Sequence, residues 1–158
     1  MKIGVLSDTH LKEVTPEFTE IYDDYLADKD AIIHAGDVVS NAVIDFLARK
    51  TFYGVHGNMD PVEVKARLPE KRIINLAGYT LGIVHGWGQP EGLEDRILPL
   101  FQDVDVLIYG HSHRGFNEMR GGVLLFNPGT ATGFSFSGQH SIGVLDLDDM
   151  IRGEIIPI

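Results

Sequence analysis

Short apolar runs alternate with segments of helical spacing through the first half of the chain. The strand-like runs are residues 2–6, 30–34 and 52–55. Between these runs, apolar side chains recur at the spacing of an amphipathic helix. Thr15 before Pro16 predicts the start of one helix, and Ser40 predicts the cap of a second. The order strand, helix, strand, helix, strand favours parallel pairing with right-handed crossovers.

The second half of the chain is mostly β in its pattern. Ala77 and Gly78 separate two apolar runs and predict a hairpin. Apolar spacing predicts a helix over residues 93–101 that Pro99 kinks or ends. The expected strands are 72–76, 79–84, 104–109, 114–119, 122–126, 140–147 and 151–157. These are too many strands for one small sheet. We therefore expect a single α/β domain over residues 1–158, with two packed sheets and helices outside.

The acidic composition narrows the function classes. The 13 Lys and Arg against 23 Asp and Glu give a formal net charge of −10, which disfavours stable binding to nucleic acid or anionic lipid. The chain has no cysteine, so a metal site would use His, Asp, Glu or Asn. No apolar run reaches the ~20 residues of a membrane span, and residues 1–6 are too short for a signal peptide. We expect a cytoplasmic protein without membrane association. The sequence does not decide whether the protein forms a homo-oligomer.

Polar residues directly follow five of the apolar runs. The metal-type side chains at these positions are Asp8, His10, Asp37, Asn58, His85, His111 and His113. Taken singly, each has an ordinary explanation as a capping carboxylate, a turn residue or a surface histidine. Two pairs, Asp8 with His10 and His111 with His113, share a spacing of two, which in extended backbone places both side chains on one face. If the strands are parallel neighbours, the five loops converge at their carboxyl ends, where open α/β sheets bind ligands.

Three further polar residues each have two interpretations. His34 either supports Asp37 and its loop or is a packed strand histidine. His56 either faces the site as a proton donor or points away by strand alternation. Asn127 either donates a hydrogen bond to a metal ligand or forms the turn before Pro128. Four aromatic residues line a substrate cleft or an oligomer interface, or pack in the core: Trp87, Phe116, Phe134 and Phe136.

Together these segments resemble the calcineurin-like metallophosphoesterase superfamily, and within it the short phosphodiesterase group of bacteria and archaea that is related to Vps29. The matching segments are Asp8-Thr9-His10, Gly36-Asp37, Gly57-Asn58, His85-Gly86, Gly110-His111-Ser112-His113 and Asn127-Pro128-Gly129-Thr130. The resemblance covers nearly the whole chain in the family's motif order. It implies an α/β fold of four layers, an α-β-β-α sandwich of two mixed sheets flanked by helices, with a binuclear metal centre at the strand ends.

The resemblance also implies a division of the ligands between two divalent ions. One ion is held by Asp8, His10 and His113. The other is held by Asn58, His85 and His111, and Asp37 bridges the two. Mn²⁺ is the first choice, and Fe, Zn, Ni or Co suit the same ligands. The implied reaction is hydrolysis of a phosphodiester, a small molecule or a nucleotide, by a hydroxide that bridges the metals. Of the ligands, we expect Asp37, Asn58 and His10 to take the most direct part in catalysis.

One position departs from the family pattern. Many superfamily members carry a histidine directly after the Asn, where this chain has Met59, and a thioether cannot donate a proton. We therefore expect activated diesters to be better substrates than alkyl monoesters. The alternative function is a non-catalytic, metal-binding interaction scaffold of the Vps29 type. The presence of all seven ligand-type residues favours the enzyme, and the Asn ligand suits an open metal site better than a closed structural one.

Overall fold

The computed structural model describes residues 1–135 and 138–158. Its first half alternates strands and helices as the sequence predicts. The elements are β1 (Lys2–Leu6), α1 (Pro16–Tyr25), β2 (Ala31–His34), α2 (Asn41–Leu47) and β3 (Thr51–Gly54). The short helix α3 (Val62–Lys65) follows. The bounds differ from the predicted runs by one residue at the ends of β2 and β3, which is the usual uncertainty of a strand end.

Side-chain caps fix where the first two helices begin. The Thr15 hydroxyl accepts a hydrogen bond from the Phe18 N–H at 3.1 Å. The Ser40 hydroxyl accepts one from the Val43 N–H at 3.3 Å. Each cap satisfies one of the backbone donors that a helix N-terminus leaves unpaired. Both predicted caps are confirmed.

The second half of the chain supplies mostly strands. Its elements are β4 (Lys71–Leu76), β5 (Tyr79–Val84), α4 (Leu93–Ile97), the 3₁₀ turn η1 (Leu98–Leu100), β6 (Val106–Ile108), β7 (Gly115–Arg120), β8 (Val123–Pro128), β9 (Ser141–Leu147) and β10 (Ile151–Pro157). The predicted helix over 93–101 ends as an α-helix at Ile97, because Pro99 cannot donate to the helical ladder. The hairpin at Ala77 and Gly78 is confirmed, since β4 and β5 pair antiparallel.

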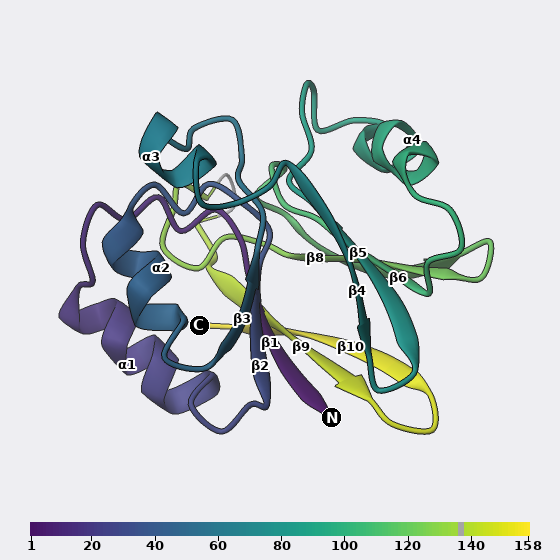
Figure 1. The fold of residues 1–158 in the computed structure, drawn as a ribbon, viewed down its shortest axis with the longest axis horizontal. Coiled ribbons are helices and arrows are strands. Elements are labelled where there is room, and N and C mark those ends of the chain that lie inside the picture. Colours follow the sequence, from purple (N-terminus) through teal and green to yellow (C-terminus); the bar gives the residue numbers. More distant parts are fainter. Residues whose placement is uncertain (136–137) are drawn as a thin grey trace.

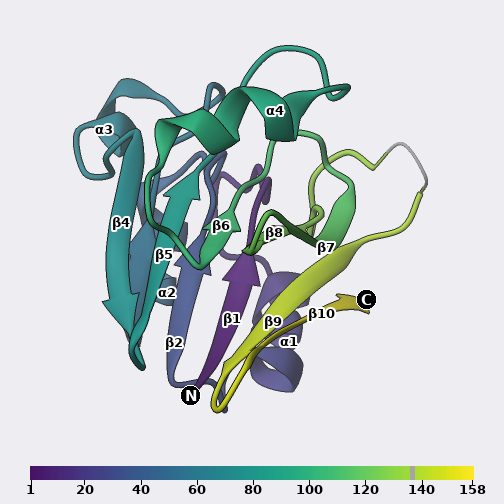
Figure 2. The ribbon, with the colours of Figure 1, turned by 90° about the vertical axis from the view of Figure 1, so that its right-hand side faces the viewer.

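The strands of the described residues form two mixed five-stranded sheets (Figure 1, Figure 2). The first sheet has the order β10-β9-β1-β2-β3, and its β1, β2 and β3 are parallel. The second sheet has the order β4-β5-β6-β8-β7, and its β5, β6 and β8 are parallel. In Figure 2 the arrowheads of β1, β2 and β5 point to the same end of the molecule. The loops that follow these strands therefore open onto one face.

Three apolar clusters hold the layers together. The central cluster lies between the sheets and includes Ile3 and Ile33 from the first sheet, with Ile83 and Ile108 from the second. A second cluster joins the first sheet to α1 and α2, and a third joins the second sheet to α4. Figure 1 shows α1 and α2 on one side of the paired sheets and α4 on the other. The fold is the predicted four-layer α-β-β-α sandwich.

The structure bears only in part on two further expectations, one about an aromatic residue and one about membrane-spanning helices. Phe136, one of the four aromatic residues proposed for a cleft or an interface, lies outside the described residues. Among the helices of residues 1–135 and 138–158, none has the length and apolar character needed to cross a membrane.

Candidate metal centre

The seven predicted ligand residues lie in loops from both sheets. Asp8 and His10 follow β1, Asp37 follows β2, and Asn58 follows β3, all strands of the first sheet. The remaining loops follow strands of the second sheet: His85 comes after β5, and His111 and His113 come after β6. The convergence expected from the sequence assumed that the strands are parallel neighbours. Instead, the packing of two sheets brings them together.

At five of these residues the backbone is left-handed rather than extended. The φ angles of Asp8, His10, Asp37, His111 and His113 are 53°, 52°, 56°, 70° and 55°. The predicted reason for each i, i+2 pair to converge, alternation along extended backbone, is therefore wrong, although both pairs do face one centre. A left-handed non-glycine residue costs roughly 1–3 kcal/mol and persists where its surroundings fix it. Here the Asp8 N–H donates to Gly36 O and the His10 N–H to Asp37 O, both at 3.0 Å.

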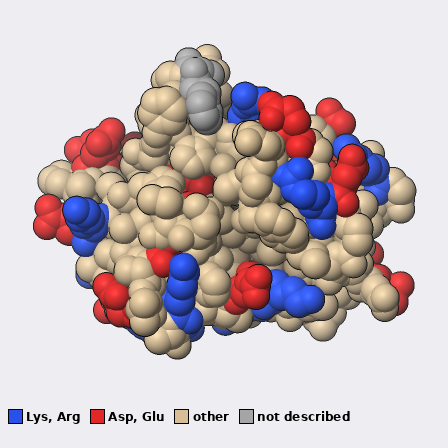
Figure 3. Space-filling view, turned by 90° about the horizontal axis from the view of Figure 1, so that it is seen from above, with Lys and Arg blue, Asp and Glu red and all other residues tan. Residues whose placement is uncertain are grey.

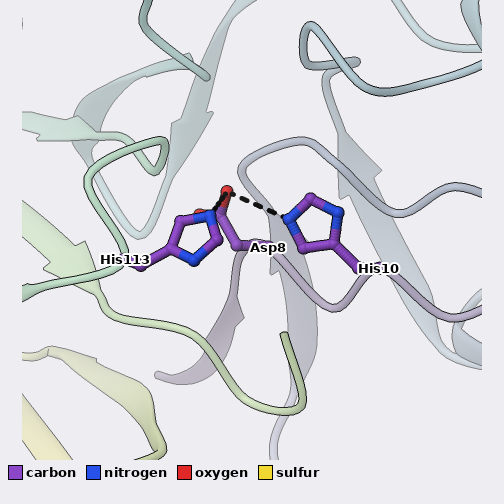
Figure 4. Close-up of side chains that lie close together, drawn as sticks. All are labelled: Asp8, His10 and His113. Carbon is purple, nitrogen blue, oxygen red and sulfur yellow. Dashed lines mark ion pairs between the residues drawn. The ribbon is translucent and has the colours of Figure 1, made fainter. Parts of the chain in front are cut away.

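Asp8 lies between two imidazoles (Figure 4). Its Oδ1 is 3.1 Å from His113 Nε2 and 3.9 Å from His10 Nε2. Asp37 Oδ2 in turn lies 3.8 Å from His10 Nε2 and 3.3 Å from His85 Nε2. One carboxylate oxygen of Asp37 thus sits between His10 and His85.

Asn58 completes the far side of the centre. Its Oδ1 lies 3.1 Å from both His85 Nε2 and His111 Nδ1. Through these contacts all seven predicted side chains belong to one connected cluster. Asn58 itself is exposed to solvent, so the cluster is open on this side.

Three of the imidazoles use one ring nitrogen to contact a backbone carbonyl. His85 Nδ1 lies 2.8 Å from Ala35 O, His111 Nε2 lies 2.8 Å from Gly88 O, and His113 Nδ1 contacts Phe134 O. A carbonyl only accepts hydrogen bonds, so each of these nitrogens carries the proton. The other nitrogen of each ring then faces the cluster. This arrangement fixes the tautomer and is the usual support of a metal-binding histidine.

Unsatisfied polar atoms show that the cluster fits divalent cations. Asp8 Oδ1 and His10 Nε2 are buried, and neither has a hydrogen-bond partner within the described parts of the chain. Such atoms are rare in folded proteins, and a bound cation would satisfy both of these. Ligand atoms of Asp8, His10 and His113 lie within 4.8 Å of one another, and so do those of Asp8, Asp37 and His85. Carboxylate and imidazole ligands suit the divalent transition metals.

The pKa values of the carboxylates and histidines in the cluster depend on one another. Burial would raise the pKa of Asp8, but contact with His113 and the charge of His85 outweigh it and leave that pKa lowered. Burial likewise opposes ionisation of Asp37, yet His85 and the Met59 N–H lower its pKa. Burial would lower the pKa of His85, but the two carboxylates raise it to about 9. Without a cation, protonated His85 therefore balances the buried negative charge.

A family model described as the calcineurin-like phosphoesterase superfamily domain matches residues 1–150. The chain belongs to the calcineurin-like phosphoesterase superfamily. The match indicates a metal-dependent phosphoester hydrolase, and it agrees with the motif order noted in the sequence.

Two archaeal relatives and one solved structure illustrate this similarity. A probable metallophosphoesterase of Methanocaldococcus jannaschii is 35% identical over 162 residues, covering 100% of this chain and 82% of the relative. A phosphodiesterase of the same organism is 32% identical over 171 residues, covering 99% of each chain. The solved structure of vacuolar protein sorting 29 from Cryptosporidium parvum has a TM-score of 0.73 at 24% identity, covering 99% of this chain and 97% of that one. The last likeness shows the shared fold.

Asp60 is a site residue that the sequence argument missed. Its buried carboxylate accepts hydrogen bonds from the N–H groups of Asp37 at 2.9 Å, Gly57 at 2.7 Å and Val39 at 2.6 Å. Val39 has a φ of 73°, a genuine outlier for a β-branched residue. Asp60 therefore ties the loop after β2 to the loop after β3 and holds Asp37 near Asn58. The signal in the sequence was an aspartate before Pro61, which resembles any turn.

Hydroxyl side chains supply a second set of supports that the sequence argument missed. Ser7 Oγ donates to Asp8 Oδ2 at 2.6 Å. Thr130 Oγ1 donates to Asp8 O at 2.8 Å, and Thr132 Oγ1 donates to Thr9 O at 2.7 Å. The segment after β8 thus holds the loop that carries Asp8 and His10. Of these residues, only Thr130 lay in a segment singled out beforehand.

The three predicted supporting residues have different outcomes. His34 is fully buried, and its Nδ1 accepts from the Gly36 N–H at 3.2 Å, so it holds the turn before Asp37. Within residues 1–135 and 138–158, Asn127 makes no hydrogen bond to the side chain of a predicted ligand. It donates instead to Gly110 O at 2.9 Å and Ser112 Oγ at 3.1 Å, and so supports the loop of His111. His56 has its Nδ1 3.4 Å from Gly57 O and lines a pocket next to Asn58.

The face that carries the cluster is not strongly charged at its centre. Figure 3 looks onto this end of the molecule, with Lys, Arg, Asp and Glu concentrated towards the rim. A small patch of acidic surface shows within the otherwise tan middle of the face. The charged side chains seen on this face therefore lie mostly around its middle rather than across it.

Proposed function

We propose that the protein is a phosphodiesterase that works with two divalent ions held by Asp8, His10, Asp37, Asn58, His85, His111 and His113. The position of Asp37 Oδ2 carries this proposal. That oxygen lies 3.8 Å from His10 Nε2 and 3.3 Å from His85 Nε2, within reach of both halves of the cluster. A single carboxylate in this position is what a bridge between two neighbouring ions requires.

In the proposed division, Asp8, His10 and His113 hold one ion, and Asn58, His85 and His111 hold the other. When bound, such ions supply an activated water and neutralise charge that develops on the phosphate. The chain's own contribution is to fix the ligands: backbone carbonyls orient His85, His111 and His113. Mn²⁺ is the proposed metal, with Fe, Zn, Ni and Co suited to the same ligands.

The charge balance supports an anionic substrate. Two divalent cations would bring four positive charges against the two negative charges of Asp8 and Asp37. The loaded centre would therefore be positive within a chain of formal net charge −10. We infer that the phosphate is drawn to this centre over short range, since screening weakens the repulsion of the distant acidic residues.

Hydrolysis of a generic aryl diester tests the proposal. Bis(p-nitrophenyl) phosphate should be hydrolysed in the presence of Mn²⁺, and Asp37→Ala should abolish the activity. Asp45→Ala is the matched control, because Asp45 is an exposed carboxylate paired with Arg67 at 2.8 Å. The control should keep the wild-type rate. A folded, metal-loaded protein that is inert towards diesters would overturn the proposal and favour an interaction scaffold.

Met59 makes the proposal more specific. This side chain follows Asn58 and is 62% exposed, and its N–H donates to Asp37 Oδ1 at 2.8 Å. Since a thioether cannot protonate a leaving group, substrates with good leaving groups should react best. We expect a higher kcat/KM for activated diesters than for alkyl monoesters. Equal values for the two substrate classes would contradict this role of Met59.

A further inference from the structure

A small pocket adjoins the metal centre on its open side. Its volume is about 200 Å³, and it shares Asn58 and His85 with the centre. The other walls include His56, Lys65, Glu70 and Trp87. A phosphate held at the centre would therefore place one of its substituents at the mouth of this pocket. The volume suits a single ring system better than a larger ligand.

The walls of the pocket combine one large aromatic side chain with hydrogen-bond donors and acceptors. Trp87 is 45% exposed, although an indole is usually buried. Lys65 Nζ is a donor and lies 3.5 Å from Asn58 O, at the edge nearest the centre. Glu70 is an acceptor, and the His56 imidazole can serve as either. A flat aromatic ring with donors and acceptors around its edge matches this combination, as a nucleobase does.

The loop that presents Trp87 is held in place by two side chains. Arg96 donates to Trp87 O and to Glu91 O, both at 2.9 Å, and also contacts Gln89 O. His111 Nε2 donates to Gly88 O at 2.8 Å. The second bond couples the loop directly to a proposed metal ligand. The backbone that carries the indole is thus held relative to the centre, which lowers the entropic cost of ordering this loop when a ring binds.

We propose that this pocket binds the base of a nucleoside phosphodiester, with the base stacked on Trp87 and the phosphate at the metal centre. The proposal rests on the proposed function, because the phosphate must be held where the seven ligands meet. It assigns the substrate class of that site and gives Trp87, Lys65 and Glu70 roles in specificity.

Fluorescence offers a direct test, because Trp87 is the single tryptophan of the chain. Adenosine 5′-monophosphate titrated into the Mn²⁺-loaded protein should change the fluorescence saturably. Ribose 5-phosphate carries the same phosphate without the base and should bind at least about fivefold more weakly by calorimetry. Equal affinity for the two probes, or no change in fluorescence, would overturn the proposal.

Two variants separate stacking from loss of structure. Trp87→Ala should bind both probes equally in calorimetry, whereas Trp87→Phe should keep the preference for the nucleotide. Hydrolysis of bis(p-nitrophenyl) phosphate is measured in parallel. If the enzyme hydrolyses the diester but binds the two probes equally, only the nucleobase proposal is overturned. If the protein hydrolyses no diester but still binds the nucleotide more tightly than ribose 5-phosphate, the phosphodiesterase proposal is overturned. The assignment of the pocket to a nucleobase then stands.

Discussion

At the scale of single residues, side chains outside the cluster fix the loops that carry it. Asp60 accepts three backbone N–H groups, and His34 accepts one, so both fix the turn around Asp37 without touching a cation. Removing such a residue moves the ligands or leaves buried donors unpaired, and either result weakens the site. Metal affinity should therefore depend on residues outside the ligand set.

The carboxylate of Asp60 provides the sharpest test of this dependence. Asp60→Ala leaves the N–H groups of Asp37, Gly57 and Val39 without their acceptor, which should lower the free energy of unfolding by roughly 2–4 kcal/mol. Mn²⁺ affinity should fall as well, because Asp37 loses its support. Urea denaturation and calorimetric titration measure the two effects. Asp30→Ala is the control, since exposed Asp30 accepts a single N–H, from Lys2, far from the centre. Equal effects of the two variants would contradict the assigned role.

His34 should make the stability of the metal-free protein depend on pH. Burial lowers the pKa of His34 to about 4, below its ordinary value of 6.5. The unfolded chain therefore binds the proton first, and the free energy of unfolding falls as the pH drops from 6.5 towards 4, by up to about 3 kcal/mol. His34→Asn keeps an acceptor for the Gly36 N–H and removes the titrating ring. Urea denaturation at several pH values should show a shallower slope for the variant. An unchanged slope would contradict the assignment.

The sequence predicted the side chains that cluster better than the residues that support them. Asp8, His10, Asp37, Asn58, His85, His111 and His113 stand out because metal-type side chains follow apolar runs. Asp60, Ser7 and Thr132 do not stand out, because their partners include backbone groups of distant loops. Nothing in the local sequence distinguishes such a residue from an ordinary turn former.

At the scale of elements, the centre lies where the loops after β1 and β6 come into close contact. The His111 N–H donates to Asp8 Oδ2 at 3.0 Å. A Cβ on Gly110 would lie 1.8 Å from Ser7 Oγ and 2.7 Å from Asp8 Oδ2. Glycine is required here for space, since its φ is not in the left-handed region. The two sheets can approach this closely because the loop after β6 has no side chain at this point.

Gly110→Ala tests this packing. The added methyl group should displace Ser7 and Asp8, lower the free energy of unfolding by roughly 1–3 kcal/mol and weaken Mn²⁺ binding. Urea denaturation and calorimetry check the two effects. The double variant Gly110→Ala with Ser7→Gly removes the closest clash and should recover part of the stability. A single variant as stable as the wild type would contradict the close approach.

Local signals explain why the elements could be predicted. Thr15 and Ser40 cap helices through bonds to residues three positions away, and Pro99 ends a helix on its own. Left-handed backbone at Asp8 and His111 is different, because the N–H groups of these residues donate hydrogen bonds to acceptors in remote loops. Periodicity cannot detect such bonds, and the extended geometry assumed for both i, i+2 pairs was wrong for that reason.

At the scale of the whole molecule, two sheets rather than one create the site. The loops after β1, β2 and β3 carry four of the seven predicted ligands, and the loops after β5 and β6 carry three. The number of strands predicted two sheets, but no local pattern determines which sheet edges meet. That depends on the shared apolar cluster of Ile3, Ile33, Ile83 and Ile108. The meeting of the loops is thus a consequence of core packing.

The most direct measurement is the anomalous scattering of manganese in crystals of the protein grown with Mn²⁺. The account predicts two peaks, about 3.5–4 Å apart. One peak should lie among Asp8, His10 and His113, and the other among Asn58, His85 and His111, with Asp37 in contact with both. A single peak, or two peaks with Asp37 bound to only one of them, would contradict the bridged two-ion centre.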